Sequence, residues 1–278
     1  MTYKFLIIQE NGRHEANRKF RECFCIQRAL TKLGHEAQIY GLNHNNENID
    51  FGSYDVILNL ENYDTGWVPN LSNFKSYKIL WSIDAHCKGI DPYRQEFHRG
   101  KYDLVLQATP EHVKDIDKSI WFPNCFDDTL IYPRGSKQYH IGFCGNFPTL
   151  DRQVFLENLS KVFPIKKDIF VIGEAMVDAI NSYQIHWNKN MSYDINYRNF
   201  ETLGCQTLLL TDYNKHYDSL GFKNMENCLI YTDFASCIKL INDINDDEIA
   251  RISKNGLELS KQHTYEQRFS KLINDIFV

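Results

Sequence analysis

The sequence lacks any long hydrophobic run. Nowhere do its 278 residues approach the roughly 18 consecutive apolar residues that a membrane-spanning helix needs, and the apolar run that ends at Ile8 is too short for a signal peptide. Eight cysteines are scattered without a C-x-x-C pair, so neither a zinc ribbon nor a redox motif is indicated. We expect a chain without a membrane span in a reducing cytoplasm, the host's if the chain is viral.

An excess of one charge is also missing. The 31 basic and 36 acidic residues give a formal charge of −5, which argues against a uniformly basic nucleic-acid coat and leaves room for a local basic groove. No G-x-G-x-x-G follows the first predicted strand, which disfavours a Rossmann oxidoreductase. No D-x-D pair lies at a predicted strand end, so we expect no obligatory metal and no cofactor.

The elements that are present alternate as in an α/β protein. An apolar, β-rich segment at residues 3–8 precedes an amphipathic helical pattern that stops at Gly34, and a second strand follows at residues 37–40. This βαβ unit implies a parallel sheet. Further strands are predicted in the first half at residues 54–60, 77–82, 103–108 and 119–122.

The alternation restarts after a polar, breaker-containing stretch at residues 133–137. Strands are predicted at 140–144, 168–172, 207–211 and 228–231, and helices at 151–162, 198–203, 234–242, 247–261 and 263–277. We therefore predict two Rossmann-like domains at residues 1–132 and 133–262, followed by a C-terminal helix at 263–278. Because open α/β sheets bind ligands at the carboxyl ends of their strands, we expect a site in an interdomain cleft.

One candidate ligand loop follows the first strand of the second domain. Gly145 lets the backbone approach a ligand closely, Asn146 comes next, and the following helix offers free N–H groups with Arg152 in its first turn. This combination suits a phosphate. A plain connection from strand to helix, with Arg152 on a solvated face, explains the same residues.

A second candidate lies in the short helix of that domain. Arg198 and Glu201 are three residues apart and share one helix face, with Asn196 and Tyr197 just before them. A guanidinium can bind a diphosphate and a carboxylate can accept hydrogen bonds from ribose hydroxyls, which is what a sugar nucleotide needs. A surface ion pair is the alternative.

The segment Asn196 to Cys205, followed by Leu208 to Thr211, resembles the R-x-F-E-x-x-x-x-G…LLT signature of group 1 glycosyltransferases of the spore-maturation (CgeB) type. The resemblance extends over about residues 140–278, through Tyr231-Thr232-Asp233 and His263-Thr264-Tyr265…Arg268. It implies a GT-B fold, with a nucleotide-sugar donor on the C-terminal domain, an acceptor on the N-terminal domain and a last helix that returns to the N-terminal domain.

The resemblance also assigns residues. It implies that Glu201 contacts the nucleotide ribose, that Arg198 contacts the diphosphate, and that the Gly145 loop with Arg152 contacts phosphate. Two positions depart from the family pattern. Gln206 replaces a usual glycine, which we expect to change how closely the backbone meets the donor, and Tyr193 stands where retaining enzymes often carry a second glutamate. The stereochemistry therefore stays open.

Titratable residues end a predicted strand of the first domain. Asp84 and His86 follow the strand at 77–82, and either can take the proton of an acceptor hydroxyl as the anomeric carbon gains oxocarbenium character. Asp84 is the first choice, His86 the second, and His14, in the loop after the first strand, a third. A helix cap at Asp84, a loop histidine at His86 and a helix start at His14 are the alternatives.

Five basic residues also crowd the first helical region: Arg13, Arg18, Lys19, Arg21 and Arg28. They can guide a polyanion such as DNA, although a solvated helix face explains them too. The sequence thus predicts a glycosyltransferase that moves a sugar from a nucleotide-sugar to a hydroxyl of a glycan, a small molecule or a hydroxymethylated base of phage DNA. A catalytically silent nucleotide- or sugar-binding protein on the same fold is the alternative.

Overall fold

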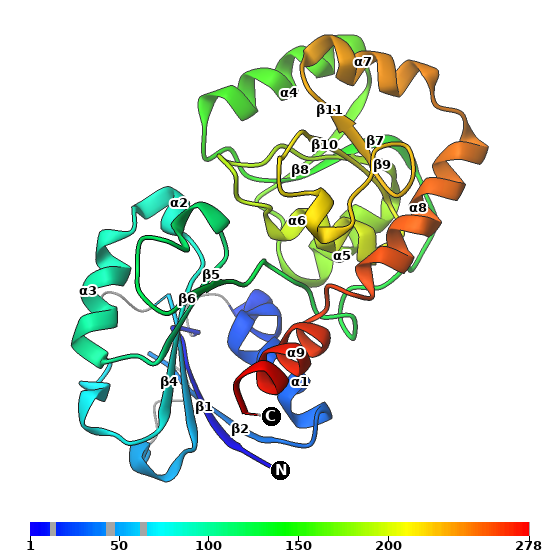
Figure 1. Ribbon diagram of the computed structural model, residues 1–278. Helices are drawn as coiled ribbons and strands as arrows, with labels where there is room; N and C mark the ends of the chain where they lie inside the picture. Colours follow the sequence, from blue (N-terminus) through cyan, green and yellow to red (C-terminus); the bar gives the residue numbers. More distant parts are fainter. Residues whose placement is uncertain (12–14, 43–47, 62–65, 278) are drawn as a thin grey trace. The chain divides into compact units, whose positions relative to one another are not determined.

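The computed structural model describes residues 1–11, 15–42, 48–61 and 66–277 (Figure 1). The chain divides into two compact units: unit 1 comprises Met1–Asn124 with Tyr265–Val278, and unit 2 comprises Cys125–Thr264. The sequence placed the first boundary at residue 132. Residues 125–132 lie with unit 2 because the Phe126 ring packs against Gly204, and because the Asn181 side-chain amide donates to the Tyr132 carbonyl at 3.1 Å.

Unit 1 is built on a six-stranded sheet in the order β2-β1-β3-β4-β5-β6, with every pair parallel. Its four central strands are nearly continuous apolar runs, as expected for a sheet covered on both faces, whereas its two edge strands are only partly buried. They are β1 (Lys4–Ile8), β2 (Glu36–Tyr40), β3 (Val56–Leu60), β4 (Tyr77–Ser82), β5 (Leu104–Gln107) and β6 (Ser119–Trp121).

The helices of unit 1 lie on both faces of this sheet. Figure 1 shows α3 on one side, with α1 and α9 together on the other. Trp81 of β4 is fully buried and meets Tyr265 and Phe269 of α9 edge to face, which ties the last helix to this sheet. The helices are α1 (Glu22–Lys32), α2 (Ala85–Lys88), α3 (Asp91–Gly100), α9 (Tyr265–Phe277) and the short 3-10 turns η1 (Glu15–Phe20), η2 (Phe51–Ser53), η3 (Leu71–Asn73) and η4 (Pro110–His112).

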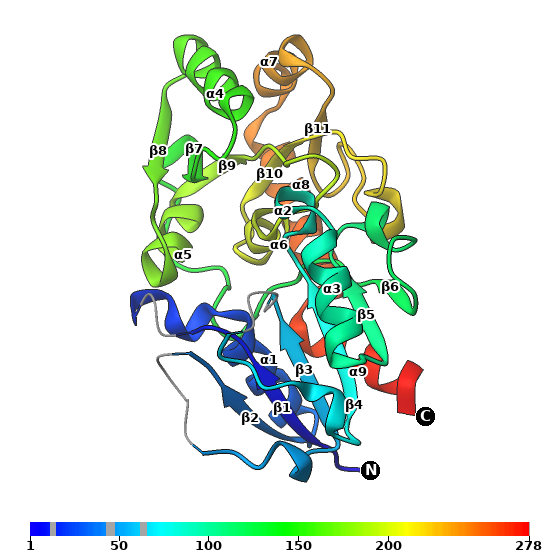
Figure 2. The ribbon, with the colours of Figure 1, turned by 90° about the vertical axis from the view of Figure 1, so that its left-hand side faces the viewer.

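Unit 2 repeats the architecture with a parallel five-stranded sheet in the order β11-β10-β9-β7-β8. Helices α4 and α7 lie together beside one face, and α5 and α6 beside the other (Figure 2). The strands are β7 (Tyr139–Gly145), β8 (Ile165–Ile169), β9 (Tyr183–Trp187), β10 (Leu208–Asp212) and β11 (Leu229–Tyr231). The helices are α4 (Leu150–Val162), α5 (Gly173–Ser182), α6 (Tyr197–Gly204), α7 (Phe234–Asp243), α8 (Asp246–Ser260) and the turn η5 (Asp218–Leu220).

The two parallel sheets confirm the predicted α/β class. The strand expected at residues 168–172 is present but lies three residues earlier, since β8 runs from Ile165 to Ile169. The apolar run that suggested a strand continues past it into a turn, where Phe170 has a φ of 59° and is 75% exposed. As an edge strand, β8 carries the lysines and the aspartate that protect exposed sheet edges.

Close packing inside unit 2 is testable at Gly142 of β7. A Cβ added there would lie 2.2 Å from the ring of Tyr183, a fully buried residue of β9. We expect Gly142→Ala to lower the free energy of unfolding by about 1–3 kcal/mol, since the ring has to shift in a packed core. Gly66→Ala is the control, because the added Cβ meets no atom of another described residue within 4 Å, chain neighbours aside. Equal urea midpoints for both variants would contradict the packing.

Candidate functional site

The strand order of the unit 2 sheet points to one place for a ligand. From β7 the chain adds β8 on one side of the sheet and then adds β9, β10 and β11 on the other side, so the order of the strands reverses between β7 and β9. Open parallel sheets bind ligands at such a switch point, outside the carboxyl ends of the strands. The region beyond Gly145 and Trp187 is therefore the candidate site of unit 2.

Arg198 and Glu201 lie at this switch point. Arg198, in the first turn of α6, donates from Nε to the carbonyl of Cys144 at the end of β7, over 3.1 Å. Its Nη1 pairs with Glu201 Oε2. The Arg198 and Glu201 side chains are only 24% and 12% exposed, so this pair is an anchored, mostly buried one rather than a solvated surface pair.

The pair keeps unused hydrogen-bonding capacity. Within the described part of the chain, neither Nη2 of Arg198 nor Oε1 of Glu201 makes a hydrogen bond or ion pair. The neighbouring Glu201 carboxylate raises the Arg198 pKa against the effect of burial, so the guanidinium stays charged. One donor group and one acceptor atom thus stand side by side at the edge of the sheet.

A buried histidine that the sequence analysis did not single out fixes this geometry. His186 of β9 accepts the Cys144 N–H at its Nε2 over 3.1 Å, and its Nδ1 lies 2.6 Å from the Thr202 hydroxyl oxygen. Burial lowers the pKa of His186 to about 3, so the ring is neutral and Nδ1 carries the proton. Thr202 in turn donates to the Arg198 carbonyl at 2.5 Å. Each donor in this series of three hydrogen bonds meets one acceptor, and the bonds hold α6 to β7 and β9.

Arg152 is buried beneath the loop that follows β7. It is 8% exposed and donates to the carbonyl oxygens of Asn146, at 3.4 Å, and Lys189, which joins the loops after β7 and after β9. Burial lowers its pKa. Asn146 is exposed, and Gly145 is half-buried with the Phe143 ring 3.1 Å from where a Cβ would lie. Arg152 is thus an internal support of the loops, not a residue on a solvated face.

The loop before α6 is stiffened by a buried amide network. Asn199 donates to Asn190 at 2.8 Å, and Asn190 donates to the hydroxyl of Tyr217 at 2.7 Å. The side-chain amides of Asn196, the residue before α6, and Asn188 donate to each other at 3.4 and 3.5 Å. The half-buried Tyr197 follows Asn196. The density of asparagine between residues 188 and 199 is the sequence signal that could have revealed this network.

In unit 1 the sequence candidates lie at the carboxyl end of β4. Asp84 occupies the position before α2, but its side chain makes no cap hydrogen bond and stays 45% exposed. His86 lies half-buried in the same short helix, and burial lowers its pKa. Lys88 approaches the Asp84 carboxylate at 3.9 Å. His14, the third candidate, lies outside the described residues.

Glu61 is a missed carboxylate beside Asp84. It follows β3 with a φ of 58°, and its Oε1 accepts the N–H groups of Ile83 and Asp84 at 2.6 and 2.7 Å and the Tyr93 hydroxyl at 2.8 Å. Burial and the nearby Asp84 raise its pKa to about 7. Glu61 therefore shapes the turn that carries Asp84. The only sequence signal for Glu61 is a single glutamate directly after a predicted strand, which is too common a pattern to single it out.

The same turn carries a group of metal-binding residue types. Ligand atoms of Asp84, His86 and Cys87 lie within 4.8 Å of one another, the one such group of three found among the described residues. A carboxylate, an imidazole and a thiol can hold a divalent cation such as Zn²⁺. The ammonium of Lys88 near Asp84 competes with a cation there.

The hydrogen-bond chain through His186 leads to a prediction at Thr202. Thr202→Val removes the hydroxyl and leaves the His186 Nδ1–H without an acceptor, so we expect a loss of about 1–3 kcal/mol in unfolding free energy. Thr202→Ser keeps the hydroxyl and is the matched control. Urea unfolding measures both variants. A Thr202→Val variant as stable as Thr202→Ser would show that the chain of bonds has no energetic role.

The raised pKa of Glu61 leads to a prediction about pH. Between pH 4.5 and about 7 the folded chain keeps a proton that the unfolded chain has lost, so this residue lowers stability as pH rises through that interval. Above it the cost is constant. We expect Glu61→Gln to gain on the order of 3 kcal/mol relative to the parent between pH 4.5 and 8. A stability difference that does not change with pH would contradict the buried, perturbed carboxyl.

No helix among the described residues is long and apolar enough to cross a membrane. No curated protein matches the sequence.

Residues 138–274 match a family model described as glycosyl transferase-like, a span that contains α6 and the loop after β7.

Three solved structures show the fold. A sucrose-phosphate synthase from Thermosynechococcus elongatus aligns over 99% of both chains, with 10% identity and a TM-score of 0.68. HepE of Anabaena in complex with UDP-glucose aligns over 99% of this chain and 100% of its own, with 10% identity and a TM-score of 0.66. An alpha-glucosyltransferase in complex with UDP and a 13-mer DNA containing an HMU base aligns over 99% of both chains, with 10% identity and a TM-score of 0.63. The chain thus has the GT-B fold, and the family match with these likenesses supports a glycosyltransferase.

Proposed function

We propose that the chain transfers a sugar from a nucleotide-sugar, bound at the carboxyl edge of the unit 2 sheet, to a hydroxyl acceptor. The observation that carries the proposal is the Arg198–Glu201 pair at the β7/β9 switch point, where Nη2 and Oε1 are unused within the described part of the chain. The glycosyl transferase-like match covers both residues.

In the proposed donor site, the cationic and the anionic residue bind different parts of the nucleotide-sugar. Arg198 presents its free Nη2 to the diphosphate, and Glu201 accepts hydrogen bonds from the ribose hydroxyls at Oε1. The loop of Gly145 and Asn146 lets the backbone approach the phosphates and leads to α4, whose N-cap residue makes no side-chain cap hydrogen bond. The buried charge of Arg152 supports the phosphates from beneath while it holds that loop.

Asn196 and Tyr197 complete the edge at the start of α6. Asn196 makes no side-chain cap to the helix, and the start of α6 brings the positive end of its helix dipole to this edge. Arg198, Arg152 and the helix dipoles supply the positive charge that neutralises the diphosphate, so the proposed reaction needs no metal at the donor.

Unit 1 supplies the base in this proposal. Asp84 is the first choice because it is exposed and because Glu61 holds its turn through two backbone N–H groups. The carboxylate takes the acceptor's hydroxyl proton while the bond from the anomeric carbon to the diphosphate breaks, and the new glycosidic bond forms. His86 is the second choice, since its lowered pKa keeps it neutral and able to accept a proton. His14 is a third, from the sequence alone.

The donor and acceptor classes rest on the solved structures. UDP or UDP-glucose is bound in two of them, which supports a UDP-sugar as the donor here. One binds DNA with a modified base, which supports a hydroxymethylated base of phage DNA in a host cytoplasm as one acceptor class, beside glycans and small molecules. Among the basic residues near α1, Arg21 and Arg28 donate to carbonyls of Glu10 and Lys19, so they are partly occupied within the chain. The spore-maturation type remains our proposal for the subfamily.

The test combines binding with turnover. We expect UDP and a UDP-sugar to raise the melting temperature of the parent, and Arg198→Ala to weaken that binding by tenfold or more, about the loss of a charged hydrogen bond. Arg251→Ala is the control, because Arg251 is exposed on α8 and, among the described residues, donates only to the Met225 carbonyl. If no nucleotide or nucleotide-sugar stabilises the parent, the donor site is wrong.

Turnover then separates the enzyme from a silent binder. We expect the parent to release UDP slowly from the donor even without an acceptor, and Asp84→Asn to abolish transfer while it binds donor as the parent does. Full transfer activity in Asp84→Asn would remove the assignment of the base. Tight donor binding without any hydrolysis or transfer would favour the silent nucleotide-sugar binder.

A further inference from the structure

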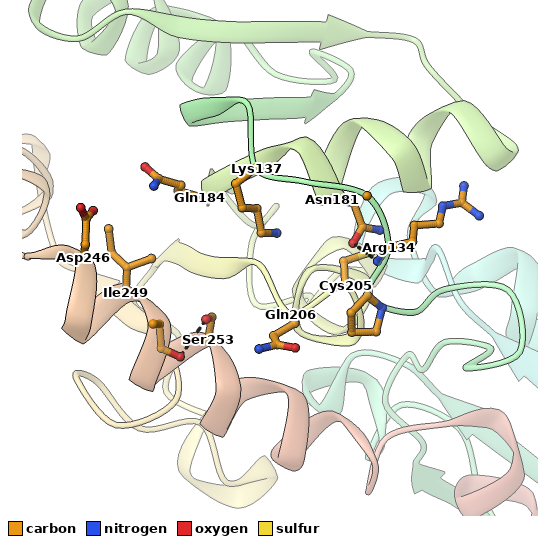
Figure 3. A pocket seen from close by; sticks show the side chains of 12 residues that line it. Arg134, Lys137, Asn181, Gln184, Cys205, Gln206, Asp246, Ile249 and Ser253 are labelled. Atoms are coloured by element: carbon orange, nitrogen blue, oxygen red, sulfur yellow. Dashed lines mark hydrogen bonds between the residues drawn. The ribbon is translucent and has the colours of Figure 1, made fainter.

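A cavity opens at the opposite edge of the unit 2 sheet, at the amino ends of its strands (Figure 3). It has a volume of about 360 Å³, within the range of small-molecule sites. Its lining comes from the segment before β7, the end of α5, the start of β9, the turn between α6 and β10, and the first turns of α8. It shares no lining residue with the donor edge described above.

The cavity contains a lysine that has no carboxylate partner among the residues that the structure describes. Lys137 extends its side chain into the cavity (Figure 3), and its Nζ donates to the Thr207 hydroxyl oxygen at 2.6 Å. Thr207 gives its own proton to the Ile180 carbonyl at 2.8 Å, so the hydroxyl serves Lys137 only as an acceptor. The other two N–H bonds of the ammonium meet no acceptor in the described part of the chain, and no carboxylate there lies within ion-pair distance.

The other charged groups around the cavity do not neutralise Lys137. Arg134 points away from it in Figure 3 and is tied to Glu174 and Asp178 at 2.7 and 2.8 Å. Asp246 stands exposed at the rim, on the first turn of α8. The Cys205 thiol beside the ammonium is neutral, because burial raises its pKa to about 12.

Gln206 adds a polar group at some conformational cost. It follows α6 with a φ of 49°, a left-handed conformation in which glycine is the least strained residue. Its side-chain amide lines the cavity and makes no hydrogen bond within the described part of the chain. Gln206 precedes the amino end of β10, so it lies at the edge of the sheet opposite the proposed donor site.

We propose that this cavity is a second ligand site, which binds a small hydroxylated anion with a single phosphate or carboxylate group. The anionic group lies on the Lys137 ammonium, and hydroxyl groups bind the Gln206 amide and the oxygen of Ser253, whose own proton goes to the Ala250 carbonyl. Asp246 at the rim accepts a hydroxyl and repels a second negative charge. The inference does not depend on the proposed transferase activity.

The state of Lys137 makes this binding depend on pH. Lys137 is exposed as a residue, but partial burial of its ammonium beside Thr207 lowers the pKa of the ammonium to about 8, and a bound anion raises that pKa again. Binding is therefore strongest below pH 8 and weakens above it as the amine loses its proton. Arg134 and Cys205 keep their charge states through this interval because one is tied to two carboxylates and the other is a buried thiol.

Isothermal titration of the full chain tests the proposal with two probes, glycerol 3-phosphate and gluconate, and with sorbitol as the neutral comparison. We expect at least one anion to bind and sorbitol not to bind; the phosphate or carboxylate probe that binds identifies the source. Lys137→Met should weaken binding by about tenfold or more, as expected for loss of a charge-assisted bond. Lys239→Gln, an exposed lysine of α7, should leave binding unchanged.

Gln206→Gly removes the amide while it relieves the left-handed backbone, so we expect weaker binding in a variant at least as stable as the parent in thermal unfolding. Arg198→Ala should bind the probes as the parent does, which separates this cavity from the donor edge. Absence of binding by both anions, or equal binding by Lys137→Met and the parent, would overturn the proposal. Loss of binding in Arg198→Ala would also overturn it by placing the probes at the donor edge.

Discussion

The geometry of unit 2 depends on the hydrogen-bonded attachment of α6 to the end of β7. The N–H of Cys144 bonds to neutral His186, whose other ring nitrogen bonds to Thr202, and Thr202 bonds to the Arg198 carbonyl. The Arg198 guanidinium returns to the Cys144 carbonyl. Backbone and side chain of one arginine are therefore held at a single strand end, and the free face of the guanidinium is preorganised at the sheet's switch point.

The sequence predicts most of the sheet architecture because buried parallel strands are short apolar runs that need little context. It does not predict β9, α5 or α3. Strand β9 carries Gln184 and His186 among its apolar residues, and its histidine is compatible with burial only because Cys144 and Thr202 satisfy both ring nitrogens. Those partners come from β7 and α6, so the pattern of β9 alone cannot reveal them.

Some residues of the candidate site can be predicted from the sequence and others cannot. Arg198 and Glu201 are predictable because one helix turn brings them together, and the structure shows that they pair. Glu61 is not predictable, since its relation to Asp84 arises from two strands that pair side by side. The position of Gln206 could not be predicted, because α6 runs from the carboxyl edge of the sheet, near Arg198, toward the amino edge, where Gln206 follows it.

A crystal structure of the chain with UDP tests most directly whether the β7/β9 edge of unit 2 is a nucleotide-diphosphate site. Our account predicts the diphosphate within hydrogen-bond distance of Arg198 Nη2 and the ribose hydroxyls at Glu201 Oε1, with the His186–Thr202 bond retained. A diphosphate bound elsewhere on the chain, with the Arg198–Glu201 pair untouched, would contradict it.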